Sequence, residues 1–182
     1  TIRLYDAETG TPTALFGTMG TEMTSPDLGH SSTVACIEFH NRQPHMLLSA
    51  GWDSSFKLWD TRKSKPCVMT TENCHTEIVS CLTALGDHYC VTGSSDSTVK
   101  VWDNRMSGRV TKKNRDLSHC GVPSARCVQT LNDHITSICS LSMCAGDAQL
   151  ITTGGDRTVR QFTSCVDHNS VEATCASSCL LQ

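Results

Sequence analysis

The sequence has few aromatic residues, no strong charge of either sign and no long hydrophobic run. Phe, Trp and Tyr make up 5% of its 182 residues, and 15 basic against 18 acidic residues give a formal net charge of -3. A weakly negative net charge gives no indication of the basic surface that binds nucleic acids, so we expect no nucleic-acid partner. The sequence also contains no transmembrane run, no signal-peptide pattern and no Asn-x-Ser/Thr sequon.

The chain lacks the closely spaced cysteine pairs of a disulfide or zinc framework, although it contains 12 cysteines. Several lie in predicted strands, where a free cysteine behaves as a small apolar residue. Near the end, a loose group lacks the Cys-x-x-Cys spacing of a structural zinc site: Cys165, His168, Cys175 and Cys179. We therefore expect no metal and no cofactor. Reduced thiols predict an intracellular protein, cytoplasmic or nuclear.

What the sequence does contain is a unit centred on residues 47–62, which read LLSAGWDSSFKLWDTR. Two apolar segments, 46–50 and 56–59, flank a turn at 51–55 that is rich in Gly, Asp and Ser. Phe56 and Leu58 alternate with Lys57, as is typical of a strand with one face buried more deeply than the other. The unit is therefore predicted to be two short strands joined by a tight turn.

This unit recurs twice downstream at a measurable period. Asp53 and Asp96 are 43 positions apart, and the same spacing separates Trp59 from Trp102. A period of about 40–45 residues is typical of four-stranded propeller blades. The third copy, around Asp156, follows after a longer interval because residues 106–124 are inserted before it.

The repeated residues resemble those of WD40 repeats. They are Gly29-His30, Asp53 and Trp59-Asp60, then His75, Asp96 and Trp102-Asp103, then His134 and Asp156. The resemblance implies an all-β fold, a WD40 β-propeller of which about four blades are visible, as part of a seven-bladed ring. Residues 1–16 would end one blade, because Tyr5-Asp6 matches the closing Trp-Asp step, so we expect the sequence to start inside a repeat. Blades are then expected at 30–70, 75–131 and 134–163, with a polar tail or a final outer strand at 164–182.

Each predicted blade offers a His, a hydroxyl, an Asp and an aromatic residue at matching offsets. The three sets are His30, Ser49, Asp53 and Trp59; His75, Thr92, Asp96 and Trp102; and His134, Thr152, Asp156 and Phe162. A hydrolase triad combines similar groups. Here, however, two hydroxyls belong to Thr, the set occurs three times, and no Gly-x-Ser-x-Gly elbow is present.

We therefore interpret the three sets as buried structural networks and predict that the chain is not an enzyme. In this interpretation the Asp accepts hydrogen bonds from a turn amide and the imidazole, and the hydroxyl and the indole N–H hold the imidazole. Phe162 has no N–H, so the third network is expected to lack one member. Asp53→Ala should unfold the protein or make it insoluble.

Trp52 is the leading candidate for partner binding. In WD40-like blades the residue before the network Asp lies on the upper face, and Trp is enriched among interface hot spots. The alternative is that Trp52 packs on its neighbouring loop. Ile78, close to the start of its strand, is a second candidate, with a place in the core as its alternative.

Two consecutive Trp-Asp-x-Arg motifs end at Arg62 and Arg105. They resemble those of substrate receptors that dock on the adaptor of cullin-4-type ubiquitin ligases, which implies both Arg side chains as adaptor contacts. The alternative is a solvated charge at the end of a strand. We thus expect a non-catalytic WD40 scaffold that mediates protein–protein interaction within a multi-protein complex, without a small-molecule substrate, or alternatively such a ligase receptor.

Two further features leave their roles open. The insertion carries Arg109, Lys112, Lys113 and Arg115. Such a loop fits an acidic partner or RNA, or is simply solvated, and no interleaved aromatics support base stacking. The last four residues, from Cys179 to Gln182, match a prenylation box, so a membrane partner is expected only if Gln182 is the true terminus and Cys179 is lipidated. One lipid chain would anchor only marginally.

Overall fold

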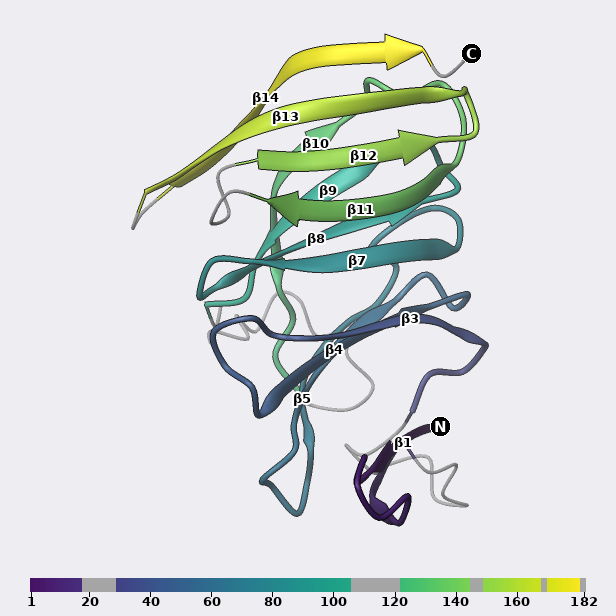
Figure 1. The fold of residues 1–182 in the computed structure, drawn as a ribbon, viewed down its shortest axis with the longest axis vertical. Coiled ribbons are helices and arrows are strands. Elements are labelled where there is room, and N and C mark those ends of the chain that lie inside the picture. Colours follow the sequence, from purple (N-terminus) through teal and green to yellow (C-terminus); the bar gives the residue numbers. More distant parts are fainter. Residues whose placement is uncertain (18–28, 106–121, 145–148, 168–169, 181–182) are drawn as a thin grey trace, which may run out of the picture.

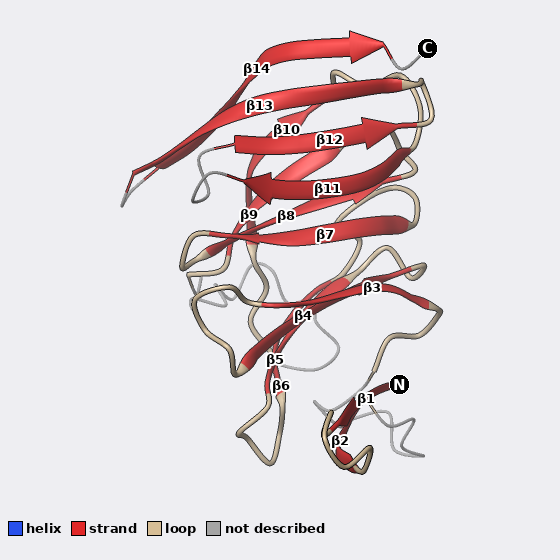
Figure 2. Ribbon diagram, in the orientation of Figure 1, coloured by secondary structure: helices blue, strands red, loops and turns tan. Residues whose placement is uncertain are grey.

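The computed structural model describes residues 1–17, 29–105, 122–144, 149–167 and 170–180. These residues form strands, turns and loops, with no helix among them (Figure 2). Accordingly, the described part of the chain holds no helix long and apolar enough to cross a membrane.

The strands form one two-stranded and three four-stranded antiparallel sheets. The partial blade consists of β1 (Ile2–Tyr5) and β2 (Pro12–Phe16). Blade 1 consists of β3 (Val34–Phe39), β4 (Met46–Gly51), β5 (Phe56–Asp60) and β6 (Cys67–Thr71). Blade 2 consists of β7 (Val79–Leu85), β8 (Tyr89–Ser94), β9 (Val99–Asp103) and β10 (Arg126–Leu131). Blade 3 consists of β11 (Ile138–Cys144), β12 (Gln149–Gly154), β13 (Thr158–Asp167) and β14 (Ser170–Leu180).

Within each four-stranded blade the strands pair in the order in which they occur in the sequence. The first strands of the three blades, β3, β7 and β11, lie one after another (Figure 1). Successive blades pack face to face, because β7 also contacts β4 and β11 also contacts β8. The sheets do not close into a ring, so the fold is a partial β-propeller, as the repeats predict.

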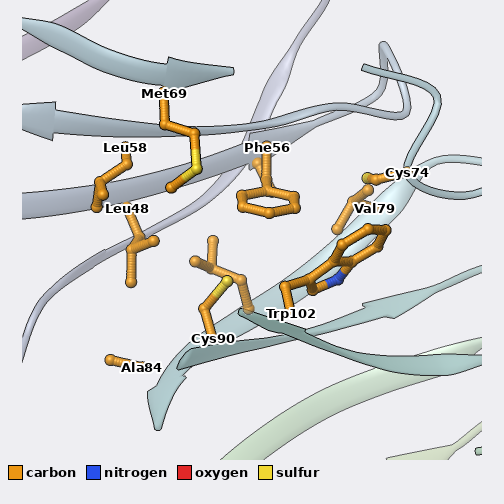
Figure 3. Close-up of a cluster of buried hydrophobic side chains, with 11 residues drawn as sticks. Leu48, Phe56, Leu58, Met69, Cys74, Val79, Ala84, Cys90 and Trp102 are labelled. Atoms are coloured by element: carbon orange, nitrogen blue, oxygen red, sulfur yellow. The ribbon is translucent and has the colours of Figure 1, made fainter. Parts of the chain in front are cut away.

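The core lies between the sheets. Between blades 1 and 2, Phe56 packs against Trp102 with ring centroids 5.3 Å apart, and Leu48, Met69 and Val79 belong to the same buried cluster (Figure 3). A second cluster joins blades 2 and 3 around Val91, Val101, Ile138 and Phe162. Burying both faces of a sheet in this way fixes each blade against its neighbours and leaves the loops at the two ends free for other contacts.

The outer edge of blade 1 is covered by the chain that leads into β10. The Thr70 amide donates to the Pro123 carbonyl over 3.0 Å, and the Ala125 amide donates to the Thr71 hydroxyl over 3.0 Å. These contacts satisfy backbone groups that a bare edge strand would expose. The described end of the insertion therefore tethers blade 2 to blade 1.

Blade 3 extends beyond its predicted end at Thr163. β13 continues to Asp167, and β14 pairs with it along its length, from Leu180 opposite Thr158 to Ser170 opposite Asp167. Residues 170–180 are thus a final outer strand and not a polar tail. An outer strand tolerates a polar sequence because its pairing needs only backbone groups.

Candidate functional site

The loops at the two ends of the blades form two faces. We call the end where β3, β7 and β11 begin the upper face. It comprises the turns 52–55, 95–98 and 155–157 and the loops 30–33, 72–78 and 132–137. The opposite end, the lower face, comprises residues 40–45, 61–66, 86–88 and 104–105.

In blade 1 the structure brings together all four predicted network residues. His30 Nδ1 lies 3.0 Å from both carboxylate oxygens of Asp53, and His30 Nε2 lies 2.8 Å from the Ser49 hydroxyl. The indole N–H of Trp59 donates to the same hydroxyl over 2.8 Å. The network thus runs through the sheet from the carboxylate near the upper face to an indole in the core.

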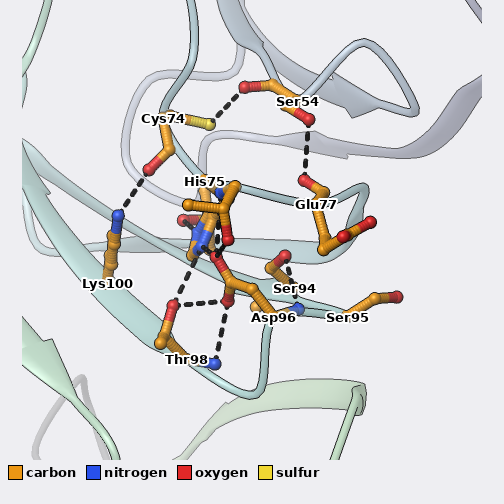
Figure 4. Close-up of polar contacts among 12 residues, drawn as sticks. Ser54, Cys74, His75, Glu77, Ser94, Ser95, Asp96, Thr98 and Lys100 are labelled. Carbon is orange, nitrogen blue, oxygen red and sulfur yellow. Dashed lines mark hydrogen bonds and ion pairs between the residues drawn. The ribbon is translucent and has the colours of Figure 1, made fainter.

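Blade 2 repeats this arrangement, and Figure 4 shows the part of it around His75, Asp96 and Thr98. His75 Nδ1 lies 3.0 Å from Asp96, and its Nε2 lies 2.7 Å from the Thr92 hydroxyl, which accepts from the Trp102 indole over 2.8 Å. The carboxylates lie at the same offset from their turns in both blades. A Ser and a Thr hydroxyl therefore serve equally well at the centre of the network.

Blade 3 keeps the network but lacks its last donor. His134 Nδ1 lies 2.8 Å from Asp156, and His134 Nε2 lies 2.8 Å from the Thr152 hydroxyl. Phe162 is fully buried at the position of the indole, where its ring fills space but cannot donate a hydrogen bond. The missing member is the one that the sequence predicts.

One detail of the predicted network was wrong. The indole N–H does not hold the imidazole: in blades 1 and 2 it donates to the hydroxyl, and the hydroxyl contacts the imidazole. The reason is that the imidazole has only two ring nitrogens, and the carboxylate and the hydroxyl already contact both of them.

A hydroxyl residue two positions after each network Asp also belongs to the network and was not predicted. Ser55, Thr98 and Thr158 donate their side-chain hydroxyls to the carboxylates over 2.7, 2.6 and 2.7 Å. Their backbone amides donate to the same carboxylates. The signal was present as Asp-x-Ser/Thr in all three repeats.

The backbone amides that follow each network His complete the site of the Asp. Those of Ser31, Thr76 and Ile135 donate to the three carboxylates over 2.9, 3.1 and 3.2 Å. Each Asp therefore accepts hydrogen bonds from its own turn and from the loop that carries the His. The carboxylate links two segments of the upper face.

The electrostatics of blade 2 fix the proton positions. Burial acts to raise the pKa of Asp96, but hydrogen bonds from Thr98 and the nearby His75 outweigh it and lower that pKa to about 2. Burial lowers the pKa of His75 more than Asp96 raises it. At neutral pH the carboxylate is thus ionised and the imidazole neutral, with the Nδ1 proton facing Asp96.

In blade 2, with Nδ1 protonated, Nε2 accepts the Thr92 hydroxyl proton, and the Thr92 oxygen accepts from the Trp102 indole. The hydroxyls of all three networks are also closed to solvent. Ser49, Thr92 and Thr152 are each 0% exposed, so a substrate has no approach to these hydroxyls. The arrangement resembles a catalytic triad in composition, but its hydroxyls are enclosed in the blade and only the carboxylates lie near the upper face.

The two predicted partner-binding residues of the upper face lie on neighbouring loops. The Trp52 side chain is 54% exposed, and its backbone amide donates to the Thr33 carbonyl over 2.9 Å. Ile78 is partly buried just before β7, and its carbonyl accepts from the Ser95 amide over 3.1 Å. Trp52 is therefore presented to solvent, whereas Ile78 is partly used in packing.

The two Trp-Asp-x-Arg motifs form ion pairs within themselves on the lower face. The Arg62 Nε and one terminal nitrogen contact the two Asp60 oxygens over 3.0 Å each, which lowers the pKa of Asp60 to about 2. Arg105 pairs with Asp103 in the same way, over 3.0 and 2.9 Å. Both motifs thus end in a closed carboxylate–guanidinium pair.

The two Arg side chains nevertheless differ. Arg62 is 64% exposed, whereas Arg105 is 34% exposed because it lies over the Tyr89 ring, 4.9 Å from the centroid, and donates to the Tyr89 hydroxyl. The sequence analysis missed Tyr89, although it lies directly opposite Asp103 in the register of β8 and β9. Arg105 is therefore anchored in its blade, and Arg62 is more available.

The remaining predictions fall partly outside the described residues. The basic residues of the insertion (Arg109, Lys112, Lys113 and Arg115) and His168 lie there. Cys179 lies in β14, opposite Val159. Where side chains are described, eight cysteines are free thiols, and His, Cys, Asp and Glu form no group of three that could hold a metal ion.

Comparisons with known proteins agree with this geometry. The WD40 family model, described as "WD domain, G-beta repeat", matches residues 22–60, 65–103 and 125–163. Mitochondrial division protein 1 of Kluyveromyces lactis is 28% identical over 157 residues, which cover 85% of this chain and 20% of that protein. Human F-box/WD repeat-containing protein 4 is 42% identical over 65 residues, covering 35% of this chain and 16% of that protein.

A third relative, small ribosomal subunit protein RACK1 of Neurospora crassa, is 32% identical over 84 residues, covering 45% of this chain and 26% of that protein. The chain thus spans about a fifth of the length of the curated relatives it matches. Each segment matched by the family model ends on the aromatic step of a repeat: Asp60, Asp103 or Thr163. With three repeats matched over most of its length, and three blades built on the same buried network, the chain belongs to the WD40-repeat family.

Proposed function

We propose that this chain is a non-catalytic scaffold that holds other proteins together in a multi-protein complex, with Trp52 as a principal contact. The family and its relatives support a role in protein interaction at this general level. Trp52 is proposed as that contact because of its place on the upper face.

The exposed indole of Trp52 is the observation that carries the proposal. Blade 1 already has its buried indole in Trp59, so Trp52 is not needed for the network. The turn that carries Trp52 is held by its amide bond to Thr33, so the side chain is presented from a fixed backbone. A large rigid side chain that is 54% exposed fits a binding anchor, since Trp loses little conformational entropy when it is covered.

The three networks also support a non-catalytic role. Their hydroxyls are buried and their His side chains are held between two partners, as is expected of groups that stabilise a blade. Cysteines such as Cys81 and Cys90 lie buried in strands as small apolar residues, which fits a reducing compartment, the cytoplasm or the nucleus.

Affinity purification with mass spectrometry tests the proposal. The wild type should retain one or more proteins that Trp52→Ala loses. Ile135→Ala is the matched control, because Ile135 is an apolar side chain of the upper face with 81% exposure. The proposal is wrong if Trp52→Ala retains every partner of the wild type, or if Ile135→Ala loses the same partners. Ile78→Ala, in a third sample, asks whether the neighbouring loop contributes.

A second candidate function is that of a substrate receptor for a cullin-4-type ubiquitin ligase. The observation that favours it is the common placement of Arg62 and Arg105 at equivalent ends of β5 and β9, both with guanidinium groups oriented by an adjacent Asp. Copurification of the ligase adaptor should fall in the Arg62→Ala, Arg105→Ala double variant. Lys63→Ala, on the same hairpin as Arg62, is the control. Unchanged copurification in the double variant, or none with the wild type, eliminates this candidate.

A further inference from the structure

The upper face of blades 1 and 2 is acidic, and this property suggests the chemistry of a partner. Three segments form this surface: the turns 51–55 and 94–98 and the loop 72–78. They carry Asp53, Glu72, Glu77 and Asp96, and they contain no Lys or Arg. Burial lowers the pKa of His75, which therefore adds no positive charge at neutral pH. The Lys100 ammonium donates to the Cys74 carbonyl over 2.7 Å and offsets one of the four negative charges, so carboxylates remain in excess on the surface around Trp52.

Trp52 and Glu77 are held on adjoining segments. Ser54, two residues after Trp52, donates its hydroxyl to the Glu77 carbonyl over 2.8 Å (Figure 4). The Cys74 amide donates to the Ser54 carbonyl over 2.9 Å. Both bonds join the turn of blade 1 to the loop of blade 2, so the exposed Trp52 and the exposed Glu77 keep a fixed relation to each other.

The position of Glu77 in its loop distinguishes it from the other exposed carboxylate. Glu77 lies two residues before β7, the first strand of its blade, and the Trp52 turn contacts the loop before β3, also a first strand. Glu72, by contrast, follows β6, the outer strand of blade 1. Glu77 thus lies on the same side of the upper face as Trp52, and Glu72 lies toward the periphery.

We propose that Trp52 and Glu77 together recognise a Lys or Arg side chain of a protein partner, an inference that rests on the proposed function and specifies the partner's chemistry. The face of an indole attracts a cation, and a carboxylate accepts charge-assisted hydrogen bonds from it. An apolar side chain at this position would desolvate Glu77 without compensation, and an acidic one would be repelled. A basic side chain is the one that satisfies both groups.

A phage library of random dodecapeptides, selected against the chain, provides the test. The enriched peptides should contain a Lys or Arg. A synthetic copy of one of them is then compared with a copy in which norleucine replaces Lys or citrulline replaces Arg. Fluorescence polarisation should show affinity at least tenfold weaker for the substituted copy. The same loss should follow from Glu77→Gln and from Trp52→Ala, whereas Glu72→Gln should bind like the wild type.

Circular dichroism checks that each variant is folded, so that a loss of binding can be assigned to the changed surface residue. The inference is overturned if no peptide is enriched, if the enriched peptides lack a basic residue, or if Glu77→Gln binds like the wild type. Binding that depends on Trp52 but not on Glu77 overturns only the basic partner and leaves the scaffold function in place. Binding that is unchanged in Trp52→Ala contradicts both the basic partner and the proposed scaffold contact at Trp52.

Discussion

The indole N–H of Trp59 donates to the Ser49 hydroxyl over 2.8 Å in the interior of blade 1. Blade 2 has the same bond between Trp102 and Thr92, but in blade 3 the ring of Phe162 replaces the indole. The same hydroxyl–imidazole contact persists in all three blades. The indole bond therefore strengthens a blade without being required for its assembly. Blade 3 provides the comparison within the same chain, because it forms with Phe162 in place of the indole.

Trp59→Phe should destabilise the protein without abolishing the fold. The substitution removes one donor from a buried hydroxyl and shrinks a buried ring, and the first effect alone is expected to lower the free energy of unfolding by about 1–3 kcal/mol. Urea denaturation at neutral pH measures the difference. Trp52→Phe is the control, since Trp52 lies on the surface and its substitution should change stability by less than about 0.5 kcal/mol. Equal effects of the two substitutions would contradict this account.

Asp53→Ala should leave the chain unfolded or insoluble. The Asp53 carboxylate accepts from His30, from the Ser31 amide and from both the amide and the hydroxyl of Ser55, and Ala leaves these four donors without it. A buried donor left unsatisfied costs about 1–3 kcal/mol, and His30 and Ser55 are both buried, so the loss is a large fraction of the stability of a domain. Soluble yield and circular dichroism provide the measurement, with Asp133→Ala, at an exposed site, as the control. A soluble, native-like Asp53→Ala protein would show that the network does not stabilise blade 1.

Gly93→Ala should loosen the contact between blades 2 and 3. A methyl group at Gly93 would lie 2.7 Å from both Cys81 Sγ and Ile138 Cγ2, closer than packed atoms allow. Overpacking of this kind typically costs about 1–3 kcal/mol. Ala50 occupies the equivalent place opposite Cys36 in blade 1, so Ala50→Gly is the matched inverse. A thermal midpoint that stays unchanged in Gly93→Ala would mean that the two blades can separate to admit the methyl group.

The sequence was sufficient to predict the blades and their networks, because the repeat itself carries the information. A His, a hydroxyl, an Asp and an aromatic residue recur at matching offsets, and a spacing that recurs three times constrains where each member lies. The predicted His, hydroxyl and Asp side chains accordingly meet within hydrogen-bond distance in every blade. The Ser or Thr two positions after each network Asp recurs in the same way and could also have been predicted, but that offset was not considered.

Contacts between blades were not predictable in the same way. Glu38 of β3 accepts from the Thr83 hydroxyl and from the Ala84 amide of β7, over 3.0 and 3.2 Å. Neither the repeat spacing nor the residue types predict these hydrogen bonds, because they depend on how far one sheet is rotated against the next. The bond from the Ser54 hydroxyl to the Glu77 carbonyl, between the turn of blade 1 and the loop before β7, also arises from the packing geometry.

Acidification should weaken the fold in two separate pH ranges. Burial lowers the pKa of His75 in the native state, whereas an unfolded His has a pKa of about 6.5. Between these values the unfolded chain binds a proton that the native chain does not. The neutral His75 of the native state therefore contributes stability that is complete above about pH 6.5 and is lost as the pH falls toward the pKa of His75 in the native state. The network Asp residues act lower, since the pKa of Asp96 is held at about 2 against an unfolded value of about 3.9.

Urea midpoints at pH 7.5, 6.0, 5.0 and 3.0 should therefore decrease in two steps, with the second beginning near the unfolded carboxylate pKa of about 3.9. NMR titration of the His75 ring assigns the first step, because its midpoint should lie below about 6.5 while the protein is still folded. A urea midpoint that rises between pH 7.5 and 5.0 would mean that the native state binds the proton more tightly than the unfolded state. The neutral imidazole, and with it the direction of the hydrogen bonds from Thr92 through His75 to Asp96, would then be wrong.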